Sequence, residues 1–160
     1  AGLGFVIVSR DLISNPQNIT PSPMNYSLLS ESSSMYNTPP TFSWYVAGKV
    51  FKWLKNKGGV KAIAQINQKK AEKLYDFIDK SDFYFNNIEV SSRSIMNIPF
   101  LLKNKNLNDK FLKHSTQKGL LALKGHRSVG GMRASIYNAM PEEGVDYLIS
   151  FMAQFEKDNL

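Results

Sequence analysis

The sequence of 160 residues contains no cysteine, only two histidines and only four arginines. The lack of cysteine excludes disulfides, thiolate metal sites and thiol catalysis, and it fits a reducing compartment, so we expect a cytoplasmic protein. Long apolar runs are also lacking, since Lys or Asn interrupts each candidate before the roughly 20 residues that a membrane span requires. With 42% hydrophobic residues, the chain should fold as a soluble protein without a membrane partner.

Positive charge comes mainly from one residue type: the net charge is +7, and lysine provides 16 of the 20 basic residues. Because these lysines are scattered over expected helix surfaces, they predict a solvated exterior and no nucleic-acid partner. The chain enters a strand-like apolar run directly after Ala1, without an initiator Met or a leader pattern, so we expect it to begin inside a domain.

A helix is expected over residues 39–57. Thr38 suits an N-cap, Pro39 suits the first helical position, and Gly58–Gly59 supplies the stop. The apolar residues of this helix recur at helical spacing and should face a core. They are Phe42, Tyr45, Val46, Val50, Trp53 and Leu54.

The rest of the chain alternates helices and strands. A second helix is expected over 60–80, with the pair Lys69–Lys70 on its solvated face. The other expected elements are strands at 3–9, 120–123 and 133–136, an alternating segment around Ile98, and helices over 108–118 and from 141 onward. This order favours an α/β fold. We expect residues 1–63 to be the end of one domain and residues 64–160 to form a small α/β domain.

The segment 124–133 gathers two of the four arginines and one of the two histidines. The guanidinium groups of Arg127 and Arg133 can bind carboxylate or phosphate with paired donors, and His126 lies beside them. Gly130–Gly131 lets the backbone bend sharply or approach a ligand. The segment is typical of an anion site, although a hairpin with solvated arginines explains the same spacing.

A second candidate site lies at residues 35–41, where Asn37, the hydroxyl of Thr38 and a helix N-terminus come together. Free N–H groups and the helix dipole favour an anion at such a place, while ordinary capping explains the pattern without a ligand. Neither candidate site has a nucleophile with its base, paired carboxylates or a metal-ligand cluster. We therefore expect no metal, and we expect the chemistry to be supplied from elsewhere.

Three motifs, in order and at fitting separations, resemble the phosphoserine aminotransferases, a family of pyridoxal-phosphate enzymes. They are MYNTPPTF at 35–42, FKWLKNKGGV at 51–60 and KGHRSVGGMRASIYNAMP at 124–141. The resemblance implies the C-terminal part of a fold type I aminotransferase, in which the end of the large domain that binds pyridoxal 5'-phosphate precedes a small C-terminal domain. It also implies that the Schiff-base lysine lies upstream of Ala1, so that this chain alone is inactive.

The resemblance implies roles for the residues of both candidate sites. Asn37 and Thr38 match residues that hold the cofactor phosphate of the neighbouring subunit, which implies a homodimer with shared active sites. Arg133 matches the arginine that binds the α-carboxylate of the substrate. His126 and Arg127 match the pair that contacts the phosphate or carboxylate at the far end.

The implied reaction is the reversible transfer of an amino group from glutamate to 3-phosphohydroxypyruvate, giving 2-oxoglutarate and O-phosphoserine in serine biosynthesis. Some members of the family also act in pyridoxine synthesis. Two other interpretations stay open: a non-catalytic anion-binding fragment or paralogue, and another aminotransferase or a desulfurase of the same fold. The pair of cation sites argues against the second, because it fits a substrate with two anionic groups.

Overall fold

The computed structural model describes residues 2–13 and 16–160, which fall into two compact units divided between Asn56 and Lys57. The domain boundary expected at residue 64 stays a prediction, and the division between the two compact units lies between two helices. Unit 1 contains 3-10 helices at Arg10–Leu12 and Ser22–Met24, followed by α1 (Tyr26–Glu31) and α2 (Thr41–Asn56). The elements of unit 2 are α3 (Gly59–Lys80), β1 (Tyr84–Phe85), β2 (Asn97–Leu102), α4 (Asn108–Gln117), β3 (Met132–Ser135) and α5 (Glu142–Lys157), with 3-10 helices at Val90–Ser92 and Lys105–Leu107.

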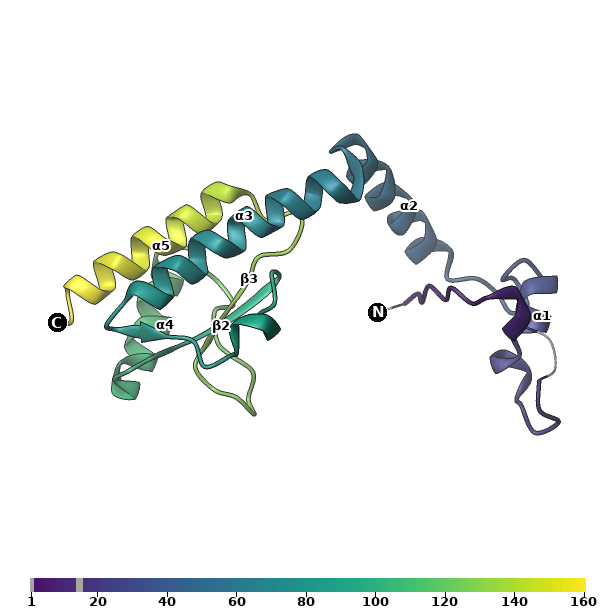
Figure 1. The fold of residues 1–160 in the computed structure, drawn as a ribbon, viewed down its shortest axis with the longest axis horizontal. Coiled ribbons are helices and arrows are strands. Elements are labelled where there is room, and N and C mark those ends of the chain that lie inside the picture. The colour runs from purple at the N-terminus through teal and green to yellow at the C-terminus, as the bar shows by residue number, and fades with distance from the viewer. Residues whose placement is uncertain (1, 14–15) are drawn as a thin grey trace. The chain divides into compact units, whose positions relative to one another are not determined.

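Unit 2 is an antiparallel sheet, ordered β1-β2-β3, with α3 and α5 side by side against one of its faces (Figure 1). Every second residue of β2 is buried, as a strand with one face on a core requires. The two long helices run in the same direction. Lys73 of α3 contacts Glu142 at the start of α5, and Ser81, directly after α3, contacts Glu156 near the end of α5. The α/β prediction is therefore confirmed.

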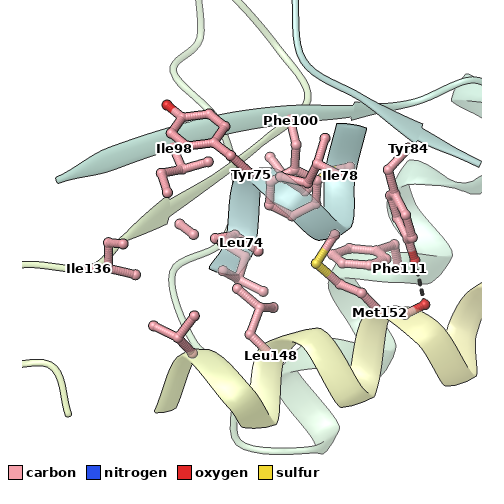
Figure 2. Packing of buried hydrophobic residues seen from close by; sticks show 14 of the residues in the cluster. Leu74, Tyr75, Ile78, Tyr84, Ile98, Phe100, Phe111, Ile136, Leu148 and Met152 are labelled. Atoms are coloured by element: carbon pink, nitrogen blue, oxygen red, sulfur yellow. Dashed lines mark hydrogen bonds between the residues drawn. The ribbon is translucent and has the colours of Figure 1, made fainter. Parts of the chain in front are cut away.

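The core of unit 2 is aromatic at its centre. Figure 2 shows side chains of α3, the sheet and α5 meeting between the layers, with Phe111 among them. Tyr84 is fully buried, and its hydroxyl donates a hydrogen bond to the Met152 carbonyl at 2.9 Å. Burial, helped by the charge of Glu156, raises the pKa of this phenol, so Tyr84 stays a neutral donor.

Both long helices expected in the first half of the chain are present, as α2 and α3. Helix α3 buries one stripe, as its apolar period predicts, whereas α2 buries no residue. The core role expected for the apolar residues of α2 is wrong within unit 1, because Phe42 and Tyr45 are 78% and 63% exposed. Helical spacing identified an apolar face, but the described segments of unit 1 leave most of it exposed, although the Phe5 ring packs edge-on against Phe51 of α2.

Two expected strands do not form among the described residues. Residues 3–9 make no regular element, and Phe5 and Ile7 on this run are exposed. Residues 120–123 are also irregular, because Ala122 has a positive φ of 58° and the backbone leaves the extended conformation there. A strand needs a partner that exchanges backbone hydrogen bonds with it, and an apolar run by itself does not supply one.

None of the helices within residues 2–13 and 16–160 has both the length and the hydropathy that crossing a membrane would require.

Candidate anion-binding site

Residues 123–133 form a β-hairpin that presents the cationic segment. The amide of Gly125 donates to the Gly131 carbonyl at 2.9 Å, and the amide of Arg133 donates to the Leu123 carbonyl at 2.7 Å. At the tip, the amides of Val129 and Gly130 both donate to the carbonyl of His126, which closes a tight turn.

Two glycines make this hairpin possible. A Cβ atom on Gly125 would lie 2.1 Å from the carbonyl oxygen of Gly130, so a side chain there would block the close approach of the two arms. Gly131 has a φ of +62°, and a Cβ on it would lie 2.8 Å from the Phe100 carbonyl. The glycine-rich pattern therefore serves the bend and the packing of the hairpin on β2.

His126 has a defined tautomer. The backbone N–H of Ser128 donates to its Nδ1 at 3.2 Å, and the Ser128 hydroxyl lies 2.7 Å from the same nitrogen. Because a backbone N–H can only donate, Nδ1 accepts, and the proton of the neutral imidazole lies on Nε2. The exposed ring thus offers an N–H donor at the tip of the hairpin, next to the exposed Arg127.

Arg133 is carried by β3. Its neighbours Met132 and Ala134 are buried in the core, whereas Arg133 borders a pocket that residues of α5 also line. The side chain is half-buried, and its buried Nε has no hydrogen-bond partner among the described residues. Buried donors are nearly always satisfied, so this nitrogen needs an acceptor that the described residues do not supply.

A pocket of about 410 Å³ lies in unit 1, and one of about 610 Å³ lies beside Arg133 in unit 2. Tyr137, Met140 and Tyr147 line the second pocket together with Arg133. This pocket has room for a small organic anion, since ligand pockets typically measure about 300–1,000 Å³. Among the described residues, no group of three or more acidic or histidine side chains is arranged to hold a metal ion.

The structure brings three of the five predicted site residues onto one hairpin: His126 and Arg127 in the turn, and Arg133 on β3. Asn37 and Thr38 belong to unit 1, where both are exposed. The expected N-cap at Thr38 is wrong, since α2 begins at Thr41 and the Pro40 carbonyl accepts from the Trp44 amide at 3.0 Å.

The sequence analysis missed one buried residue near this site. It placed Lys70 on a solvated face, yet the side chain is 0% exposed and burial lowers the pKa of its ammonium. Helical geometry contained the signal, because Asn67 and Lys70 lie about one and two turns after Ile63, on the stripe that also buries Leu74. The prediction relied on the charge of Lys70 alone and therefore placed this residue on the wrong side of the helix.

Solved structures share this fold. A phosphoserine aminotransferase from Bacillus circulans subsp. alkalophilus matches 94% of the chain with a TM-score of 0.89 and 44% identity. A phosphoserine aminotransferase from Trichomonas vaginalis, solved with pyridoxal phosphate bound, matches 90% of the chain with a TM-score of 0.83 and 42% identity. The chain thus has the fold of pyridoxal-phosphate-dependent aminotransferases, covering 42% of each of those two chains.

The sequence comparisons agree with the fold. The aminotransferase class-V family matches residues 1–148, and the chain belongs to this family. A phosphoserine aminotransferase of Hahella chejuensis is 58% identical over 99% of the chain. The chain spans 44% of the length of that relative.

Proposed function

We propose that the full-length protein containing this chain is a phosphoserine aminotransferase, which transfers an amino group from glutamate to 3-phosphohydroxypyruvate and yields 2-oxoglutarate and O-phosphoserine. The observation that carries the proposal is the 58% identity to a phosphoserine aminotransferase, maintained over 99% of the chain. The cationic hairpin supports it, because each substrate of this reaction has two anionic groups.

The described residues suit two anions. In this proposal the guanidinium of Arg133 binds the α-carboxylate with paired donors. The Nε2–H of His126 and the guanidinium of Arg127 bind the second anion, the phosphate of phosphoserine or the distal carboxylate of glutamate. Holding the substrate at both ends fixes its orientation, so the reacting carbon is presented in one geometry.

Pyridoxal 5'-phosphate belongs to the same proposal. The exposed amide of Asn37 and the hydroxyl of Thr38 precede α2 and can donate to a phosphate group, so these residues fit its anionic end. When bound, the cofactor supplies an electron sink for the charge that develops on the substrate. The lysine that holds it covalently is proposed to lie in the part of the relatives' length that this chain does not span, which leaves the isolated chain inactive.

The homodimer with shared active sites, the cytoplasmic location and an additional role in pyridoxine synthesis stay predictions of the family resemblance.

The test is steady-state kinetics of the full-length protein carrying Arg133→Ala. Loss of a charged hydrogen bond to the α-carboxylate should lower kcat/KM for glutamate and for phosphoserine alike, by roughly 10- to 150-fold. Arg93→Ala is the matched control, because Arg93 is engaged by Asp79 on another part of the sheet domain and should leave both KM values unchanged. A wild-type protein that does not transaminate these substrates overturns the proposal, and an Arg133→Ala variant with normal kinetics overturns the role of Arg133.

A further inference from the structure

Lys70 donates all of its ammonium protons to one loop. Its Nζ lies 3.2 Å from the Ile136 carbonyl oxygen, 2.9 Å from that of Tyr137 and 2.9 Å from that of Met140. The side chain reaches these acceptors from the middle of α3, and it is 0% exposed. A residue of helix α3 thereby holds the loop that joins β3 to α5.

The same loop shapes the pocket beside Arg133. It starts directly after β3, the strand that carries Arg133, and its residues Tyr137 and Met140 line the pocket together with that arginine. Asn67, which precedes Lys70 by about one helical turn, adds a second anchor by donating from Nδ2 to the Asn138 Oδ1 at 2.8 Å. Two buried polar residues of α3 therefore hold this loop by hydrogen bonds.

A lysine suits this arrangement. Three carbonyl oxygens converge on one point, and an ammonium offers three donors from a single atom. The planar guanidinium of arginine distributes its donors over a wider fork, whereas methionine or leucine would leave the carbonyls unpaired in the interior. Burying an ammonium is unfavourable, and the three hydrogen bonds to the loop offset that cost.

We propose that Lys70 is a positioning residue: by fixing the Ile136–Met140 loop, it sets the pocket wall against which Arg133 holds the substrate carboxylate. The inference rests on the proposed function of Arg133. Lys70 itself is buried and is not among the residues that line the pocket.

The test is the full-length protein with Lys70→Met, a substitution of similar length that removes the three donors. The matched control is Lys69→Met, since Lys69 is the adjacent lysine but lies on the surface, with a side chain 65% exposed. Lys70→Met should raise KM for glutamate by about tenfold or more, with a smaller change in kcat per folded enzyme, and Lys69→Met should leave KM unchanged. A Lys70 that only stabilises the fold would reduce the folded fraction without moving KM, and that result overturns the proposal.

If Lys70→Met does not fold, Asn67→Ala replaces it, because it loosens the same loop while keeping the lysine. A rise in KM for glutamate supports the proposal, and an unchanged KM overturns it.

Failure of the proposed function is recognised separately, by a wild-type protein that lacks the transaminase activity. In that case amide hydrogen exchange decides the positioning role of Lys70 in the whole protein. Faster exchange at Met140, whose amide donates to the Tyr137 carbonyl, with unchanged exchange in α4, supports the role. Equal exchange of the Met140 amide in wild type and variant overturns it.

Discussion

Tyr84 shows how a single polar atom is accommodated in an apolar centre. The ring packs edge-on against Phe83, Phe100 and Phe111, and the hydroxyl reaches the Met152 carbonyl of α5. Edge-to-face geometry is favourable for aromatic rings, and a buried hydroxyl needs a partner of this kind. Tyr84 therefore connects the sheet to α5 by a hydrogen bond and also fills space in the core.

Tyr84→Phe removes that hydrogen bond and keeps the packing. We expect the free energy of unfolding to fall by about 0.5–1.5 kcal/mol, the usual net contribution of one such bond. Urea denaturation followed by circular dichroism measures it, with Tyr147→Phe, whose hydroxyl bonds the Lys118 carbonyl at the surface, as the control. Equal stability of Tyr84→Phe and wild type would contradict the structural role of this bond.

The first turn of α5 is joined to α3 by an ion-pair cluster. Glu142 lies 3.0 Å from the Nζ of Lys69 and 2.8 Å from the Nζ of Lys73. Its position at a helix N-terminus also favours a negative charge. Hydrogen bonds from Lys73 and Lys69 lower the pKa of Glu142, and the neighbouring carboxylates of Asp146 and Glu142 raise the pKa of Lys73.

Glu142→Gln should destabilise the protein at pH 7 and have less effect in acid. Because the pKa of Glu142 is lower in the folded state, its contribution is present above the unfolded-state value of about 4.3 and is lost as pH falls through the folded-state pKa. Unfolding free energies at pH 7 and pH 3 test this, and raised salt should also shrink the difference because the cluster is solvent-exposed. A stability difference that is independent of both pH and salt would rule out the ion pairs as its source.

At the scale of the whole molecule, burial is concentrated in one unit. Among residues 2–13 and 16–160, the buried hydrophobic residues all lie between Ile63 and Phe155, and none of the described helices of unit 1 buries a residue. An apolar core with its own sheet and covering helices is the property of a domain that can fold by itself. The described part of unit 1 lacks such a core.

A fragment of residues 57–160 should therefore unfold in urea as one cooperative transition, with an m-value of about 1–3 kcal/mol/M. Phe111→Ala in this fragment removes a ring at the centre of the core and should cost about 3–5 kcal/mol. A fragment of residues 1–56 should show no cooperative transition. A gradual, non-cooperative loss of ellipticity by the 57–160 fragment would refute the autonomy of unit 2.

Much of the local structure could be predicted from the sequence. The apolar period that ends near Gly58 and the period that follows it mark α2 and α3, and Pro141 with its acidic neighbours marks the start of α5. These signals are local, because capping and helical spacing involve residues within one or two turns. The sequence also shows that His126, Arg127 and Arg133 lie within ten positions, and the structure places them on one hairpin, while their binding roles stay predictions.

Burial and pairing depended on the tertiary structure. Lys70 is buried because the Ile136–Met140 loop, far away in the sequence, supplies its acceptors, and no pattern within α3 specifies those carbonyls. The apolar run at 3–9 stays unpaired for the converse reason, since a strand exists only where another segment shares its hydrogen bonds. The sequence by itself determined which helices form and which family the chain resembles, whereas contacts between distant segments decided what is buried and where the Arg133 pocket lies.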